Sequence, residues 1–143
     1  MRFWDSSALV PLCVEQPASA VSRQLLEEDG EMVVWWGTTV ECASAFARLR
    51  REGILSLSDE EAARSILMTL RSVWNEVQPG DLLREYALRI LRLHPLRAAD
   101  TLQLAAAMEW ADVPASGYFV TFDARLRQAA RLEGFDIGSF HLQ

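Results

Sequence analysis

The sequence predicts an α/β domain built around a mainly parallel β-sheet. Short runs rich in β-branched and aromatic residues alternate with longer segments of helical periodicity, the pattern of such a fold. The 143 residues are 50% apolar and 24% charged, as in an ordinary globular domain. A chain of this length forms one sizeable core, and the sequence contains no linker or repeat. We therefore expect a single domain over residues 1–143.

The N-terminal half is predicted to hold two strands. The first strand ends at Asp5, and the second is a compact apolar run that precedes Gly37 and suits a buried position. The helix between them has apolar residues at helical spacing and stops at Gly30, a natural C-terminal cap. The predicted strands cover residues 2–5 and 32–36, and the predicted helices cover residues 18–29 and 38–53.

The C-terminal half is predicted to be mainly helical. Ser58-Asp59-Glu60-Glu61 has the form of a capping box and begins a helix whose apolar face continues to Val77. Gln78-Pro79-Gly80 then breaks the chain. The other predicted helices cover residues 81–93, 96–112 and 123–132, and predicted strands cover residues 118–122 and 135–137, the second at a sheet edge.

The charge of the chain limits how it binds and reacts. The formal net charge is −6, and the 14 residues counted as lysine or arginine are all arginine. Proteins that bind the nucleic acid backbone are usually basic. Either this chain does not bind nucleic acid, or its carboxylates hold a divalent metal that reverses the local charge. The absence of lysine excludes mechanisms that need a catalytic or phosphate-binding lysine.

The sequence predicts a cytoplasmic protein without a membrane partner. It has no apolar run of about 18 residues, and Asp5 interrupts the N-terminal apolar stretch before a secretory signal can form. Cys13 and Cys42 stand among apolar residues, which predicts buried free thiols in a reducing compartment.

Three acidic residues fall where predicted strands lead into helices. Asp5 ends the first strand, Glu41 follows the second, and Asp123 follows the third. Carboxylates at the carboxyl ends of parallel strands face the crevice where open α/β sheets bind ligands. Local structural roles are also open: Asp5 and Asp123 suit helix N-caps. Glu41 suits a capping box with Thr38.

Asp100 lies in a predicted helix that is apolar on nearly all sides. The residues on its face are Leu104, Ala107, Met108 and Ala111. A carboxylate there is costly unless it is paired, hydrogen-bonded or bound to metal. An ion pair with Arg97, three positions earlier, is the structural alternative, but we favour a functional role.

These acids predict a metal site at one edge of the sheet. Four neighbouring carboxylates repel one another and raise one another's pKa values. Mg2+ and Mn2+ resolve this repulsion because they prefer carboxylate and water oxygens. We therefore expect a Mg2+ (or Mn2+) site whose metal ligands and catalytic residues are Asp5, Glu41, Asp100 and Asp123.

The chain resembles the PIN-domain ribonucleases, and among them the small VapC-like toxins of type II toxin–antitoxin (VapBC) systems. The matching stretches span the chain in the family's order: Phe3-Trp4-Asp5-Ser6-Ser7-Ala8-Leu9, Thr38-Thr39-Val40-Glu41, Leu96-Arg97-Ala98-Ala99-Asp100-Thr101-Leu102-Gln103-Leu104-Ala105-Ala106-Ala107 and Phe119-Val120-Thr121-Phe122-Asp123. The stretches around Asp5 and Asp100 are the most specific.

The resemblance implies a PIN-like three-layer fold with a mainly parallel central sheet flanked by helices. It also implies a metal-dependent endoribonuclease that cleaves RNA phosphodiesters with the four acids. Ser6 or Ser7, with Thr121, would orient the carboxylates or ordered water. The toxin type implies a homodimer and a small cognate antitoxin that obstructs the acidic site.

Missing residues argue against two functional alternatives, and others stay open. An aspartyl phosphohydrolase expects a second aspartate where Ser7 stands, and both it and a receiver-type signalling domain expect lysine, which is absent. A non-catalytic interaction module with the same fold, or a housekeeping RNA-processing nuclease, is an alternative to a toxin.

The arginines at 48, 50, 51, 125, 127 and 131 are candidate RNA contacts or parts of a solvated face. At most one of Trp35 and Trp36 would be available to stack on bases, and packing in the core is the favoured role for the pair.

Overall fold

The computed structural model describes residues 1–112 and 117–140 of the chain. The described strands are β1 (Arg2–Trp4), β2 (Met32–Trp35), β3 (Asn75–Val77) and β4 (Phe119–Val120). The described helices are α1 (Ser6–Cys13), α2 (Ser19–Glu28), α3 (Thr38–Arg51), α4 (Leu57–Arg71), α5 (Asp81–Leu93), α6 (Ala98–Ala111) and α7 (Ala124–Leu132).

The four strands form one sheet in the order β3-β2-β1-β4, and every pair in it is parallel. Phe3 of the central strand β1 is the pairing partner of Val33 in β2 and of Phe119 in β4. The predicted mainly parallel sheet is therefore confirmed. Because all strands run the same way, their carboxyl ends meet at one edge, where ligands bind in open α/β sheets.

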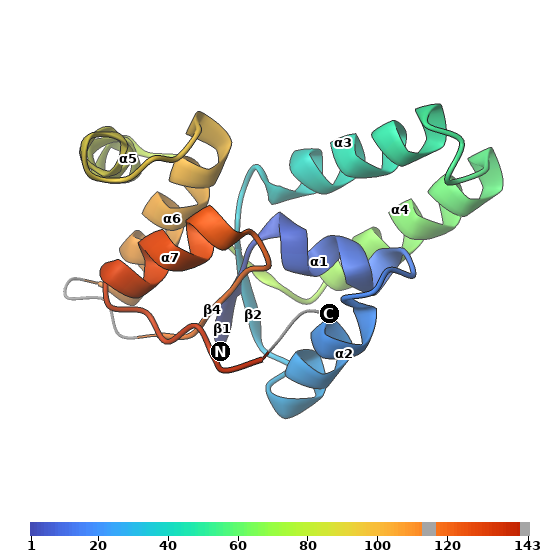
Figure 1. Cartoon of the computed structure of the whole chain (residues 1–143), viewed down its shortest axis with the longest axis horizontal. Helices are drawn as coiled ribbons and strands as arrows, with labels where there is room; N and C mark the ends of the chain where they lie inside the picture. Colours follow the sequence, from blue (N-terminus) through green and yellow to red (C-terminus); the bar gives the residue numbers. More distant parts are fainter. Residues whose placement is uncertain (113–116, 141–143) are drawn as a thin grey trace.

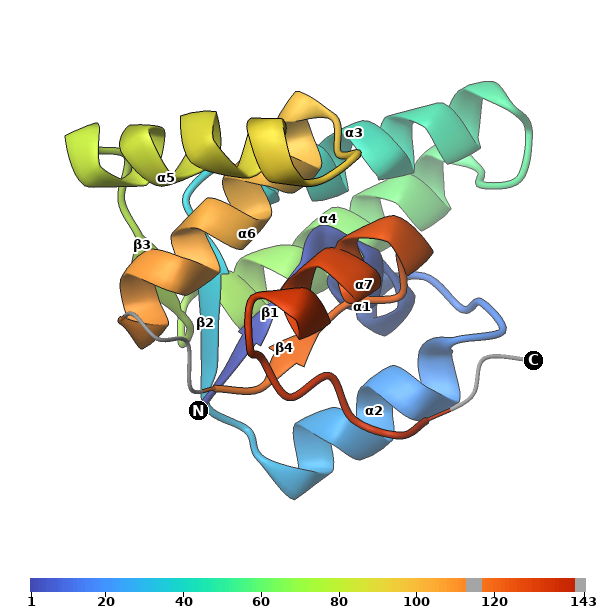
Figure 2. The ribbon, with the colours of Figure 1, turned by 60° about the vertical axis from the view of Figure 1, so that its left-hand side comes forward.

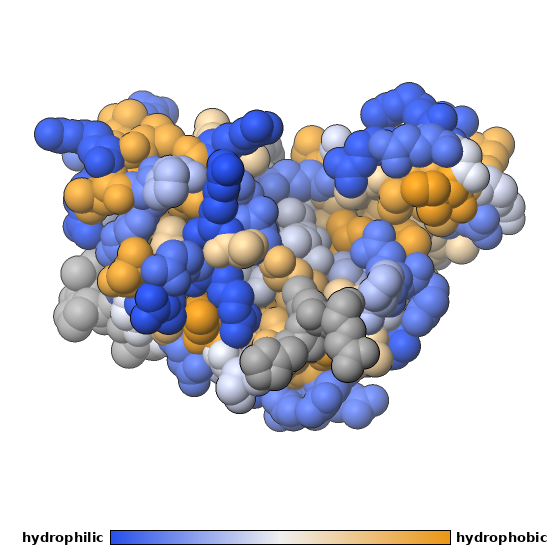
Figure 3. Space-filling model, in the orientation of Figure 1, coloured by the Kyte–Doolittle hydropathy of each residue, from blue (hydrophilic) through white to orange (hydrophobic). Residues whose placement is uncertain are grey.

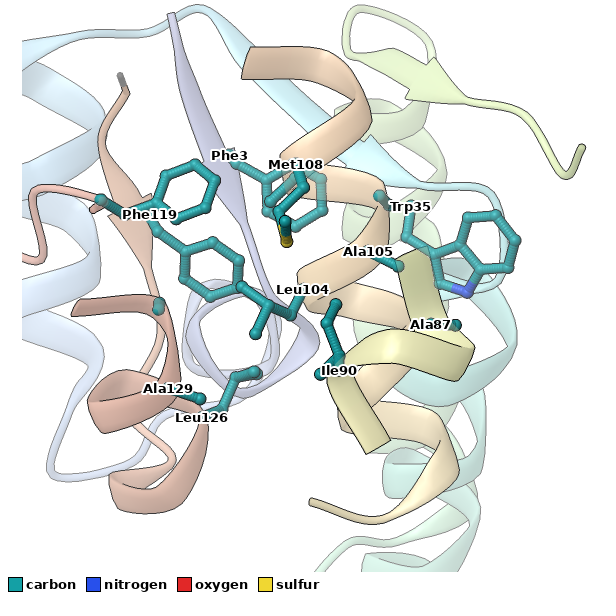
Figure 4. Close-up of a cluster of buried hydrophobic side chains, with 14 of the residues drawn as sticks. Phe3, Trp35, Ala87, Ile90, Leu104, Ala105, Met108, Phe119, Leu126 and Ala129 are labelled. Atoms are coloured by element: carbon teal, nitrogen blue, oxygen red, sulfur yellow. The ribbon is translucent and has the colours of Figure 1, made fainter. Parts of the chain in front are cut away.

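Helices cover both faces of the sheet in three layers, as predicted. Strand residues alternate between the faces, so neighbours such as Phe3 and Trp4 belong to different hydrophobic clusters. Phe3 packs in the cluster that includes residues of α5, α6 and α7, part of which Figure 4 shows. Trp4 packs in the cluster that includes residues of α1 to α4. Figures 1 and 2 show the two groups of helices on either side of the strands.

Helix α6 occupies the centre of its layer, between the sheet and α5. Its residues from Gln103 to Met108 are all buried, which agrees with the prediction from its apolar sequence. Trp35 of β2 packs into the same cluster, whereas its neighbour Trp36 leaves 52% of its surface exposed. One tryptophan of the pair therefore belongs to the core, and the other lies just after the end of β2.

The structure corrects the predicted helix over residues 58–77. Helix α4 begins earlier, because Ser56 is its N-cap and forms a capping box with Asp59, so the predicted box at Ser58 is wrong. The helix ends at Arg71, and residues that were expected to continue it form the edge strand β3. Backbone pairing with β2 over Asn75–Val77 outweighs the helical pattern there.

The C-terminal strands are shorter than predicted. Only Phe119 and Val120 of the expected strand at 118–122 form β4. The expected edge strand at 135–137 is reduced to a single parallel bridge between Asp136 and Tyr118.

Both predicted buried thiols, Cys13 and Cys42, are buried and free. In the described ranges, none of the helices has the length and apolar character required to cross a membrane.

Candidate functional site

The four predicted acids line one hollow at the carboxyl edge of the sheet. Its volume is about 680 Å³, and its lining includes Asp5, Glu41, Asp100 and Asp123. Asp5 follows β1, and Glu41 lies in the first turn of α3, which follows β2. Asp100 lies in the first turn of α6, and Asp123 immediately precedes α7. Residues from four separate parts of the chain are therefore brought to one place.

Asp5 is the most deeply buried of these carboxylates, with 2% of its surface exposed. Its Oδ2 accepts hydrogen bonds from Ser7 Oγ at 2.6 Å and Thr121 Oγ1 at 2.9 Å. Burial raises the pKa of Asp5 above its ordinary value, and the hydrogen bonds from Ser7 and Thr121 oppose that shift. Asp5 also accepts from the backbone N–H of Ser7, so it caps α1 while it faces the hollow. The two interpretations of Asp5 are compatible.

Ser7 connects the segments that follow β1 and β4, which contain Asp5 and Asp123. Besides its bond to Asp5, its Oγ accepts a hydrogen bond from the backbone N–H of Phe122 at 2.9 Å. Thr121 likewise binds Asp5 and accepts from the N–H of Asp123 at 3.2 Å. These hydroxyls fix the segment that carries Asp123 relative to Asp5. Their position agrees with the orienting role expected of Ser7 and Thr121.

Glu41 is held by side chains from two other helices, not by a capping box. The N-cap of α3 is Gly37, and no side chain caps that helix. Glu41 Oε1 accepts from Ser6 Oγ at 3.2 Å, and Oε2 accepts from Gln103 Nε2 at 2.9 Å. The local explanation of Glu41 is therefore wrong.

The position of Glu41 raises its pKa to about 7. Burial is the largest cause, and the neighbouring charge of Asp5 adds to it. The hydrogen bonds from Gln103 and Ser6 act in the opposite direction. The charged form of Glu41 is therefore unfavourable near neutral pH unless a positive charge lies beside it.

Asp100 is only half-buried, because it lies at the start of α6 instead of along its buried middle. Burial and the charges of Asp123 and Asp5 raise its pKa, while Arg97 lowers it. No ion pair joins Asp100 to Arg97 among the described residues. The electropositive end of the helix also favours a carboxylate there. The sequence argument from an apolar helix face therefore overstated how buried Asp100 is.

Asp123 is the N-cap of α7, where its Oδ1 accepts from the N–H of Leu126 at 2.8 Å. It nevertheless lines the hollow and raises the pKa of Asp100. Capping therefore places this carboxylate without removing it from the site. As with Asp5, the structural role and the expected functional position coincide.

The donor set fits a hard divalent cation. In the described part of the chain, none of the four carboxylates has an arginine or histidine within ion-pair distance. Their mutual repulsion is offset only in part, by the charge of Arg97 near Asp100. All donors are oxygens, the chemistry that Mg2+ and Mn2+ select. No three acid, histidine or cysteine side chains of the described residues stand close enough to chelate an ion directly. Binding would therefore require side-chain adjustment or bridging water.

Gln103 is a site residue that the sequence did not single out. It is completely buried, and its Nε2 donates to both Thr38 Oγ1 and Glu41 Oε2 at 2.9 Å. Its Oε1 is buried without a partner among the described atoms. The only sequence signal was its position in a helix one turn after Asp100. An amide in an otherwise apolar stretch needs buried partners.

Several candidate RNA-binding arginines are engaged elsewhere. Arg50 pairs with Glu60 at 2.7 Å. Arg127 donates to the carbonyl of Gly138 and lies over the ring of Phe140. Arg48, which lies 3.9 Å from Glu52, and Arg125 line hollows that include the acids. The structure thus divides the candidates predicted from the sequence.

Comparisons with known proteins agree with this geometry. The family described as PIN domain matches residues 2–132. A chain of a toxin–antitoxin complex from Klebsiella pneumoniae is similar, with a TM-score of 0.62 and 15% identity over 87% of this chain and 88% of that one. A chain of FitAcB from Neisseria gonorrhoeae has a TM-score of 0.61 and 17% identity over 92% and 94% of the two chains. No curated protein sequence matches significantly.

Proposed function

The chain belongs to the PIN domain family, and from this premise we propose that it is a Mg2+- or Mn2+-dependent endoribonuclease. The observation that carries the proposal is the convergence of Asp5, Glu41, Asp100 and Asp123 on one hollow with no basic partner among the described residues. Such a site repels a phosphodiester until a cation is present. The alternative of a non-catalytic module gives no reason to keep these charges together.

In the proposed mechanism, the four carboxylates would hold the cation, and the surrounding polar residues hold the carboxylates. A bound Mg2+ or Mn2+ would supply positive charge to the scissile phosphate and lower the pKa of a coordinated water. Ser7 and Thr121 orient Asp5 through its Oδ2. The Ser6 hydroxyl lies within hydrogen-bond distance of both Asp5 Oδ1 and Glu41 Oε1 and can donate to either. These contacts restrict where the carboxylates can lie, which helps to orient the reacting groups for in-line hydrolysis.

The direct test is cleavage of a short single-stranded RNA by the purified chain. We expect cleavage in the presence of Mg2+ or Mn2+ and none after chelation with EDTA. The products should carry 5′-phosphate and 3′-hydroxyl ends, which end-labelling and mass spectrometry distinguish. RNA that stays intact with either metal would contradict the proposal and would favour the non-catalytic alternative.

We further propose that the chain is a cytoplasmic toxin that forms a homodimer and pairs with a small antitoxin protein. The fold it shares with a chain of the toxin–antitoxin complex supports this assignment. Induced expression should arrest growth, and co-expression of the adjacent small gene product should restore it. Normal growth with active enzyme present would instead favour a housekeeping RNA-processing nuclease.

Gln103→Leu is expected to lower kcat/KM by about 10–100-fold, the usual effect of losing a partner of a metal ligand. Leucine keeps much of the volume of Gln103 but removes the donor to Glu41 Oε2. The melting temperature should fall modestly, because Thr38 Oγ1 and Glu41 Oε2 lose a buried donor, while removal of a buried oxygen without a partner offsets part of that loss. The matched control is Gln24→Leu, since Gln24 is exposed and donates only to Glu28 among the described residues. Equal activity of the two variants would rule out a positioning role for Gln103.

A further inference from the structure

A second hollow adjoins the acidic one. Its volume is about 350 Å³, and it is lined by Pro95, Arg97, Asp100, Asp123 and Arg125. It shares Asp100 and Asp123 with the first hollow, so a linear ligand at the carboxylates extends directly into it. Two arginines, Arg97 and Arg125, face these two aspartates in the second hollow, whereas acids predominate in the first. Figure 3 shows strongly hydrophilic side chains over α6 and α7, the helices that carry this lining.

The two arginines of this hollow are not used by the fold. Both are exposed, and neither forms an ion pair or side-chain hydrogen bond among the described residues. Most arginines of the chain do: those at 2, 23, 48, 50, 64, 71, 84 and 89 lie within 4.0 Å of a carboxylate. Arg97 and Arg125 therefore bring two positive charges, neither in an ion pair among the described residues, to the acids of a chain whose net charge is −6.

The start of α6 adds to the positive character of this hollow. Arg97 is the N-cap of α6, and no side chain caps the helix. The first backbone N–H groups of α6 therefore keep their capacity to bind an anion, and the helix dipole favours one there. Helix α7 differs, because the Asp123 side chain already occupies its N-terminus.

We propose that Arg97 and Arg125 form a phosphate subsite that holds an RNA backbone phosphate next to the one that is cleaved. The inference rests on the proposed function. Guanidinium groups match phosphate oxygens in geometry and charge. The lining contains no aromatic residue on which a base could stack, so the subsite reads the backbone and is indifferent to base identity. Local basic charge also explains how an acidic chain holds a polyanion near its carboxylates.

The binding test uses the Asp5→Asn variant, which separates RNA binding from cleavage. Its affinity for a fluorescent single-stranded oligoribonucleotide is measured by anisotropy over a series of salt concentrations. Adding Arg97→Ala and Arg125→Ala should weaken binding about equally for different sequences. The slope of log K against log salt should fall by about 0.7, the value for one lost phosphate contact on a single strand. Arg125→Ala alone should give half of this change, without the effect that Arg97 has on the pKa of Asp100.

The matched control is Arg23→Ala with Arg84→Ala. This pair changes the net charge equally, but both arginines are exposed and already paired, with Glu15 and Asp81. We expect it to alter neither the slope nor the affinity measurably. In the active enzyme, the Arg97 and Arg125 substitutions should raise KM far more than they lower kcat. Lysine at both positions should restore part of the affinity, which a purely structural role would not predict.

The outcomes separate the subsite from the function. An unchanged salt slope in an enzyme that still cleaves RNA would overturn the subsite and leave the nuclease assignment intact. Unchanged RNA binding combined with lost binding of the antitoxin would assign the arginines to a protein partner and also overturn it. If neither the active enzyme nor the Asp5→Asn variant acts on or binds RNA, the proposed function and the subsite both fail.

Discussion

Asp5→Asn is expected to reduce RNA cleavage by more than about 100-fold, because even the outer partners of metal ligands contribute about 10–100-fold. Asp5 is 2% exposed, and three donors surround its Oδ2. Asparagine has the same shape but no charge to offer a cation. Single-turnover cleavage in Mg2+ and in Mn2+ measures the loss, and higher metal concentration should not restore it.

The folded state should tolerate this change. Burial raises the pKa of Asp5, which means that the charged form is unfavourable in the metal-free protein. Asparagine removes that cost, and the hydroxyls of Ser7 and Thr121 can rotate to suit its oxygen. The melting temperature should therefore be equal or higher. Asp81→Asn is the control, because the Asp81 side chain is 94% exposed, and a similar loss of activity there would show that Asp5 has no special role.

Local signals located most of the helices, and they placed the ends of the first two strands to within one residue. The break at Gln78-Pro79-Gly80 places the start of α5 at Asp81, as predicted. Elsewhere the sequence offers two equivalent choices. Ser56 and Ser58 both stand three residues before an acid, and only the structure selects Ser56 with Asp59. Strand β3 carries no β-rich sequence, and its pairing with β2 is the interaction that defines it.

The position of the carboxylates was predictable because parallel strands bring their ends to one edge. The contacts that hold them were less so. Ser7 and Thr121 lie next to the predicted aspartates in sequence, but Gln103 meets Glu41 from 62 residues away. That contact depends on how α6 packs near the start of α3, which periodicity does not specify. For the same reason, Asp100 could not be distinguished from the buried residues one turn later.

The metal-free protein is expected to lose stability as the pH rises from about 5 to about 8. The pKa of Glu41 is about 7 in the folded chain, against an ordinary value of 4.5. Between these values the folded state holds a proton that the unfolded state has released, so raising the pH favours unfolding until Glu41 is fully charged. The raised pKa values of Asp5 and Asp100 act in the same direction.

Thermal unfolding in EDTA measures this dependence. Asp29 and Asp59 have lowered pKa values and lose their stabilising effect only at acid pH, below the range compared. Glu41→Gln isolates the contribution of one carboxyl, because every other titrating group remains in place. The variant should show a smaller decrease between the two pH values than the original chain. A melting temperature that rises across this range in the original chain would contradict the expected sign.

Mg2+ or Mn2+ should reverse the trend. A cation binds the deprotonated carboxylates and competes with protons, so it should stabilise the chain strongly near pH 8 and weakly near pH 5. At about 100 times its Kd, a ligand that binds only the folded state adds about 2.7 kcal/mol to the free energy of unfolding. This gain should be much reduced in Asp5→Asn and retained in Asp81→Asn. If the cation stabilised the original chain and both variants equally, it would bind elsewhere. It would then not relieve the repulsion among Asp5, Glu41 and Asp100.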